Sequence, residues 1–216
     1  MALKLYGYEN NPRTRIIRIV AAAQGVSLEL VNVVPRSDIN RDLLIDKFPR
    51  SCGKIPALDG PGVSLTEVMA IAHYVTKVAG PTTLLGDGSP GQEAEVISWM
   101  SWANQELLVT LAKWPAAYDN KSVEAGKTSS LAMLETLEAV IGDRECLVGE
   151  ATTLADIFVA VVLSRGLEWV LDGKWRAQHP NCMRHFDKVR SWAPVASVIP
   201  EFVLVEKEPI ISDPYI

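Results

Sequence analysis

The chain has 216 residues with 21 basic and 26 acidic side chains, and this well-mixed set gives a formal net charge of -5, without the basic patch that nucleic-acid binding needs. No apolar run approaches the roughly 20 residues that a transmembrane helix requires, and the first residues show no signal-peptide pattern. The charge pattern and the lack of a long apolar run therefore lead us to expect no nucleic-acid and no membrane partner. The three cysteines lack metal-ligand spacing and suit a reducing compartment, so we expect a cytoplasmic protein with no metal site.

Strand and helix patterns alternate over the first part of the chain. Residues 3–7 and 27–34 have the pattern of strands, and residues 13–24 have that of a helix that Gly25 ends. Residues 37–47 predict a second, shorter helix. A helix between two strands implies a parallel pair joined by a right-handed crossover, so we expect a small α/β layer.

The segment from Lys54 to Glu67 contains the clearest candidate site. Residues 57–65 predict two short strands around a turn rich in glycine and proline, which adds an antiparallel hairpin to the sheet. A strand edge fixed by Pro56 leaves backbone groups free for an extended peptide, and the helix that begins near Glu67 offers free amides to a carboxylate. The segment therefore predicts a site for a small acidic peptide.

The sequence pattern of the remainder of the chain predicts an all-α domain. Glycine and proline interrupt the pattern, so we expect domains at residues 1–80 and 92–216 with a linker at 81–91. Thr153 and Asp156 form a predicted capping box before an apolar, buried helix, which favours a structural role for Asp156 over a catalytic one. His73, inside an apolar helix, is expected to be a core histidine.

The unit from Lys54 to Glu67 and the capping box of Thr153 and Asp156 together resemble the glutathione S-transferase family, and the resemblance covers nearly the whole chain. Within the family the resemblance is greatest to the transferase-like domain of the gamma subunit of translation elongation factor 1. The stretches that carry this closer resemblance are residues 65–71, 99–104, 120–123 and, above all, 168–180. The resemblance implies a thioredoxin-like N-terminal domain with a cis peptide bond before Pro56, followed by a helical C-terminal domain.

The resemblance also implies a glutathione site. Lys54 would face the glycyl carboxylate, the backbone of Ile55 beside Pro56 would pair with the cysteinyl part, and Glu67 would pair with the γ-glutamyl ammonium. Val68 stands where the family has serine, so only its backbone amide remains for the γ-glutamyl carboxylate. Lys54 could instead be a solvated surface lysine, and Glu67 an ordinary acid in a first helical turn.

The residue that would activate the glutathione thiol is the second departure from the family pattern. Asn11 stands where a serine usually does, and its amide could donate to a thiolate. Tyr8 and Thr14 are further candidate donors. Alternatively, Asn11 and Pro12 are simply the turn and helix start before residues 13–24.

Two functions remain open from the sequence. The first is an enzyme, a homodimer by family default, that conjugates glutathione to electrophilic small molecules; Trp102 and Trp114 are candidate walls of its acceptor pocket. The second is a weakly active or non-catalytic scaffold that binds other elongation factor subunits. The gamma subunit continues through a charged linker, whereas this sequence stops at Ile216, so we expect a stand-alone paralogue.

Overall fold

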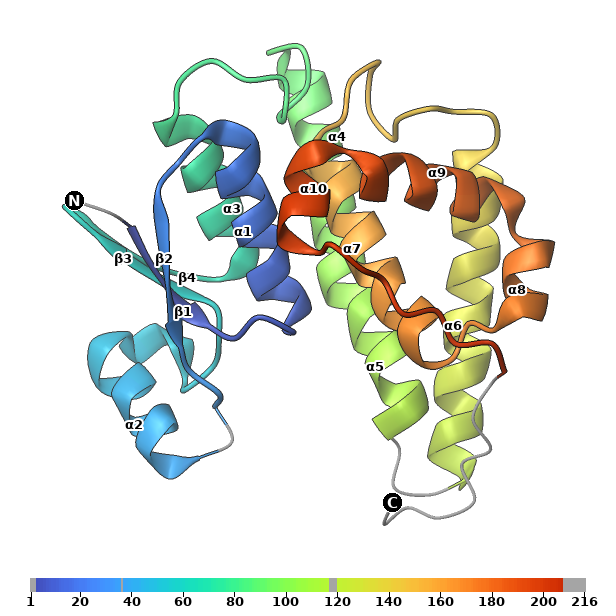
Figure 1. The fold of residues 1–216 in the computed structure, drawn as a ribbon, viewed down its shortest axis with the longest axis horizontal. Helices are drawn as coiled ribbons and strands as arrows, with labels where there is room; N and C mark the ends of the chain where they lie inside the picture. The colour runs from blue at the N-terminus through green and yellow to red at the C-terminus, as the bar shows by residue number, and fades with distance from the viewer. Residues whose placement is uncertain (1–2, 36, 117–119, 208–216) are drawn as a thin grey trace.

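The structure, a computed structural model, describes residues 3–35, 37–116 and 120–207 (Figure 1). Its first part contains a mixed sheet with helices on both faces, as the alternating pattern predicts. The elements are β1 (Leu3–Gly7), α1 (Pro12–Gln24), β2 (Leu28–Asn32), α2 (Asp38–Lys47), a 3₁₀ turn (Pro49–Ser51), β3 (Ala57–Gly60), β4 (Val63–Thr66) and α3 (Val68–Val78).

The sheet has the strand order β2-β1-β3-β4. β1 and β2 are parallel, whereas β3 pairs antiparallel with both β1 and β4. The parallel pair and the antiparallel hairpin are both as expected from the sequence. The hairpin places the segment around Pro56 next to the start of α3.

Alternation along the strands separates two apolar layers. Leu5 of β1 and Leu58 of β3 point into the large core with α1 and α3, whereas Tyr6 and Ala57, one residue away, pack against Leu44 of α2. Successive side chains of a strand point to opposite faces of the sheet. The sheet is therefore covered on both sides, and α1 and α3 lie on the side that continues into the helical part.

The ends of α1 follow from its sequence. The Asn11 side chain accepts a hydrogen bond from the Thr14 amide at 3.1 Å, and Pro12 occupies the first helical turn. Gly25 ends the helix in the left-handed conformation with φ of 64°, as predicted. These signals fix the helix start beside the turn that follows β1.

The second part of the chain is helical. α3 ends at Val78, and no strand follows it in the part of the chain that the structure describes. Among the described residues, no helix is long and apolar enough to cross a membrane. The elements are α4 (Pro90–Ser101), a π-helical segment (Trp102–Leu107), α5 (Leu108–Ala116), α6 (Asn120–Ile141), α7 (Leu154–Trp169), α8 (Gly173–Gln178), α9 (Pro180–Ser191) and α10 (Ala193–Val198).

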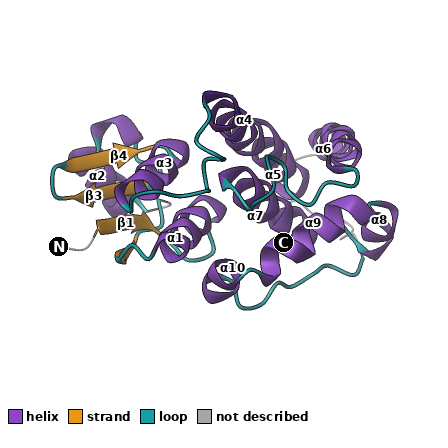
Figure 2. Ribbon diagram, turned by 90° about the horizontal axis from the view of Figure 1, so that it is seen from above, coloured by secondary structure: helices purple, strands orange, loops and turns teal. Residues whose placement is uncertain are grey.

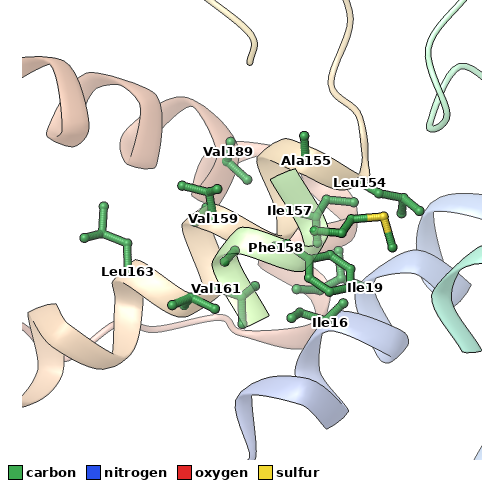
Figure 3. Packing of buried hydrophobic residues seen from close by; sticks show 14 of the residues in the cluster. Ile16, Ile19, Leu154, Ala155, Ile157, Phe158, Val159, Val161, Leu163 and Val189 are labelled. Carbon is green, nitrogen blue, oxygen red and sulfur yellow. The ribbon is translucent and has the colours of Figure 1, made fainter. Parts of the chain in front are cut away.

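One continuous core joins the two parts through α1 and α7. Figure 2 shows α1 at the side of the sheet that faces the helices, next to α7 and α10. In Figure 3, Phe158 of α7 packs against Ile16 and Ile19 of α1, and all three side chains are buried. Residues 154–164 of α7 are all buried, so α7 is the central helix that the sequence predicts.

Asp156 holds the start of α7 through several hydrogen bonds. Its Oδ2 accepts from the Thr153 amide at 2.8 Å and the Thr153 hydroxyl at 3.0 Å, which confirms the capping role. Its Oδ1 accepts from the Leu147 amide at 2.8 Å and lies 2.9 Å from His185 Nε2. Burial favours a raised Asp156 pKa, but the hydrogen bond and charge of His185, together with the amides, leave it below its usual value.

The histidines differ from the sequence interpretation. His73 is only half-buried, and its Nε2 lies 3.2 Å from Glu93 Oε1, so the expectation of a core histidine is wrong. Its position on α3 turns it toward the start of α4 rather than into the sheet-facing core. The buried histidines are His179 and His185, both of which join helices of the second part.

Replacing Asp156 with Asn should lower the free energy of unfolding at pH 7 by about 3 to 5 kcal/mol, because His185 and the amides would lose their charged acceptor. The folded-state pKa is lowered, so this contribution is present above the unfolded-state value of about 3.9 and is lost as the pH falls through the folded-state value. Urea unfolding from pH 7 to pH 3 should show the difference between the two proteins shrinking below about pH 4.

Asp187→Asn is the matched control, because Asp187 is an exposed acid paired with Arg190. It should change stability by less than about 1 kcal/mol. A wild-type advantage over Asp156→Asn that stayed constant down to pH 3 would contradict a role for the Asp156 charge.

Candidate functional site

A cavity of about 380 Å³ opens between the sheet part and the helical part of the chain. It brings together all five residues that the sequence assigns to peptide binding: Lys54, Ile55, Pro56, Glu67 and Val68. The remaining lining residues are Arg13, Ser51, Thr66, Asn104, Gln105 and Val109. The cavity thus combines both ends of the predicted hairpin unit with one turn of the helical part.

The hairpin supplies a free backbone edge. The peptide bond between Ile55 and Pro56 is cis, as the family resemblance implies. Pro56 is buried and directly precedes β3, while Ile55 is half-buried. Among the described residues, neither the amide nor the carbonyl of Ile55 has a hydrogen-bond partner in the protein. These two groups can therefore pair with an extended ligand at the cavity wall.

The start of α3 forms the opposite wall. Glu67 has φ of 72° and ψ of 120°, an uncommon conformation for a residue with a side chain, and it provides no side-chain cap. The first amides of α3 are left without a capping side chain, and Val68 at the first position is buried. The free amides of an uncapped helix start can donate hydrogen bonds to an anionic group.

Arg13 adds a cation that sequence reasoning missed. Its Nε donates to Asn104 Oδ1 at 2.6 Å, which joins the first turn of α1 to the π-helical segment. Burial lowers the Arg13 pKa from its usual value, and the negative charge of Glu67 partly offsets that effect. No sequence pattern paired Arg13 with Asn104, because 91 positions separate them.

The three candidate thiol donors surround the start of α1 but do not line this cavity. Asn11 Oδ1 is engaged by the Thr14 amide, while the Asn11 Nδ2 group has no partner among the described residues. Thr14 is fully buried, and its hydroxyl lies 3.5 Å from Asn11 Oδ1. Tyr8 is half-buried in the preceding turn. Of these three, Asn11 and Tyr8 retain exposure.

The two candidate tryptophan walls differ in exposure. Trp114 is buried in the core, which makes it a packing residue. Trp102 is half-buried in the π-helical segment and forms an edge-to-face pair with Trp99, with ring centroids 5.6 Å apart. Neither lines the cavity described above.

Comparison with known proteins agrees with this architecture. The family model described as the N-terminal domain of glutathione S-transferase matches residues 1–77, and that of the C-terminal domain matches residues 102–192. Glutathione S-transferase stcT of Emericella nidulans is 34% identical over 218 residues, 97% of each chain. Glutathione S-transferase psoE of Aspergillus fumigatus is 32% identical over 94% of this chain and 85% of its own length.

Among solved structures, the GST-like domain of elongation factor 1-gamma from Saccharomyces cerevisiae is similar along its whole length. It has a TM-score of 0.81 and 28% identity, and the match covers 97% of this chain and 99% of that domain. The fold, the two matched domains and the identity to the fungal relatives agree: the chain belongs to the glutathione S-transferase family.

Proposed function

We propose that the protein binds glutathione in the cavity between its two parts and conjugates the glutathione thiol to electrophilic small molecules. The observation that carries the proposal is the convergence of Lys54, Ile55, Pro56 and Glu67 on one cavity together with the uncapped start of α3. These groups offer a cation, a free backbone edge, a carboxylate and helix amides. Glutathione carries the matching carboxylates, amides and ammonium.

In this proposal each part of glutathione has a binding partner among the residues of the cavity. Lys54 is exposed and faces the glycyl carboxylate as a point charge, while the free backbone of Ile55 pairs with the cysteinyl residue. Glu67 takes the γ-glutamyl ammonium, and the first amides of α3 take its carboxylate. Because Val68 lacks the serine hydroxyl, one hydrogen bond is missing, which weakens binding by about 0.5 to 3 kcal/mol.

Only the thiolate form of glutathione attacks an electrophile, and a free cysteine thiol, with a pKa near 8.5, is mostly protonated at neutral pH. The site must therefore stabilise the thiolate. The thiolate attacks an electrophilic carbon, a carbon–sulfur bond forms, the leaving group departs with its electron pair, and the thiol proton passes to solvent. In this proposal the glutathione thiol projects from the cavity toward the start of α1, where the Asn11 Nδ2 group and the Tyr8 hydroxyl are the candidate donors to the anion. The positive charge of Arg13, which lines the cavity, favours the anion further.

A second candidate function is that of a non-catalytic module in an elongation factor complex. The similarity to the GST-like domain of yeast elongation factor 1-gamma favours it. Val68 and Asn11 favour it too, because they stand at positions where the family resemblance implies a serine. Conjugation of glutathione to an electrophile distinguishes the two functions, because only the enzyme would catalyse it. For either one we propose a cytoplasmic homodimer with domains at residues 1–80 and 92–216.

Calorimetry with glutathione and conjugation of 1-chloro-2,4-dinitrobenzene, measured on the same sample, test the proposal directly. We expect weak binding and measurable turnover. Val68→Ser should tighten glutathione binding about 2- to 160-fold, the equivalent of one hydrogen bond of about 0.5 to 3 kcal/mol; Val68→Ala is the control. Binding without turnover would favour the scaffold, and no binding would contradict the glutathione site itself.

Two substitutions that both preserve the α1 cap isolate the donor role of Asn11. Asn11→Asp keeps an acceptor for the Thr14 amide but loses the amide donor, and we expect kcat/KM to fall about tenfold, the equivalent of roughly 1.4 kcal/mol. Asn11→Ser restores a hydroxyl donor and should be at least as active as the wild type. Equal activity of all three proteins, at equal melting temperature, would leave Asn11 as a helix cap only.

The conformation of Glu67 predicts a conflict between stability and binding. Glycine adopts a positive φ freely, so Glu67→Gly should stabilise the fold by about 1 kcal/mol. The same change removes the ammonium partner and should weaken glutathione binding at least tenfold. Glu67→Gln, which keeps the strain, should weaken binding without any gain in thermal stability; a loss of stability in Glu67→Gly would contradict the strain.

A further inference from the structure

A second group of charged side chains lies where α1 faces the end of α7. Arg15 of α1 and Arg165 of α7 both bind the carboxylate of Glu168, Arg15 at 3.2 Å, and Trp169 follows at the helix end. We call these four residues the α7 arginine cluster. It plays no part in the glutathione contacts proposed above, and its residues do not line the 380 Å³ cavity.

The charges of the cluster do not balance. Two guanidinium groups share one carboxylate, and the three charged side chains are each only 12 to 15% exposed. Arg15 has a further partner in Asn10 Oδ1 at 3.2 Å. The Nε of Arg165, by contrast, is buried without a hydrogen-bond partner among the described residues. A positive charge held away from water with an unused donor is costly unless an anion completes it.

The surroundings of Arg165 support this account. Burial lowers its pKa, the Glu168 carboxylate opposes that effect, and the positive charge of Arg15 adds to it. An incoming anion would remove the repulsion between the two guanidinium groups. A guanidinium is planar and carries paired donors, which suit a carboxylate or a sulfonate better than a halide or a neutral group.

Trp169 gives the cluster an aromatic face. The Arg165 guanidinium lies 4.0 Å from the centre of the Trp169 ring, and Trp169 is still 40% exposed. An exposed indole beside a desolvated guanidinium favours a ligand that has a flat ring next to its negative charge.

The cluster is next to the turn that carries the candidate thiol donors. Arg15 donates to Asn10 Oδ1 at 3.2 Å, and Asn10 lies in the turn in which the Asn11 amide donates to the Tyr8 carbonyl at 3.1 Å. A molecule held by the cluster therefore lies beside the same turn from which Tyr8 and Asn11 would stabilise the thiolate. This juxtaposition links the cluster to the electrophile rather than to glutathione.

We propose that the α7 arginine cluster selects acceptor substrates that carry an anionic group on an aromatic ring, with Arg165 binding the anion and Trp169 contacting the ring. The proposal rests on the transferase function and specifies its substrate class. Conjugation of a chloroarene forms the aryl carbon–sulfur bond and breaks the carbon–chlorine bond, so chloride leaves with the electron pair and the thiol proton goes to solvent. The anionic group is unchanged in the reaction.

Two chloroarenes test the proposal, the anionic 4-chloro-3,5-dinitrobenzoate and the neutral 1-chloro-2,4-dinitrobenzene. The readout is the ratio of their kcat/KM values in each protein, because their intrinsic reactivities differ. Arg165→Met should lower this ratio at least tenfold, and Glu168→Gln, which removes the competing carboxylate, should raise it. An equal loss with both arenes, or an unchanged ratio, would overturn the proposal.

Arg190→Met is the matched control. Arg190 also lies over an aromatic ring, 5.8 Å from the centre of Phe186, and pairs with a carboxylate three positions away, but on α9. Its ratio should equal that of the wild type. If Arg165→Met fails to fold, the test rests on the ratio of the two kcat/KM values in Glu168→Gln. An unchanged or lowered ratio in that variant would overturn the proposal.

A direct binding measurement separates this proposal from the transferase function. Calorimetry of the wild type with 3,5-dinitrobenzoate and with 1,3-dinitrobenzene should show preferred binding of the benzoate that is lost in Arg165→Met and retained in Arg190→Met. If this holds while neither chloroarene is conjugated, the anion site stands and the catalytic function falls. If conjugation occurs but the benzoate binds independently of Arg165, the cluster is only a contact between the two parts.

Discussion

The carboxylate of Asp156 is the constraint on which the rest of the molecule depends. It accepts hydrogen bonds from the Thr153 amide and hydroxyl, the Leu147 amide and the His185 ring, all in the interior. These contacts fix the start of α7, the loop before it and α9 around one charge. Because residues 154–164 of α7 are buried on every side, the position of this helix determines how the other helices pack.

α1 connects α7 to the candidate functional site. One face of α1 contributes Ile16 and Ile19 to the core around α7, while its first turn lies between the two parts of the chain. Arg13 reaches Asn104 in the direction of the cavity, and Arg15 reaches Glu168 at the end of α7. A single short helix therefore relates the proposed glutathione site to the proposed acceptor site, so a shift of α7 against α1 would disturb both.

The glutathione site that we propose depends largely on the backbone. Recognition by the backbone of Ile55 and by the first amides of α3 would require a conformation rather than particular side chains. The family resemblance places hydroxyl side chains at positions 68 and 11, and with Val68 and Asn11 there the helix start and the α1 cap are preserved. In the proposed site these residues would weaken individual hydrogen bonds without removing the site, which is why binding and turnover must be measured separately.

Local patterns in the sequence predicted the strands and helices up to α3, the end of α1 at Gly25, the capping box of Thr153 and Asp156, and the hairpin beside Pro56. Caps, turns and alternation act between residues a few positions apart, so the sequence by itself determines them. The pairings of Asp156 with His185, Arg13 with Asn104 and Arg15 with Glu168 were not predictable in this way, and His73 was assigned to the wrong environment. Each depends on which helix faces meet, and only the packing of α7 against α1 and α9 decides that, because contacts between distant segments form through the shared core.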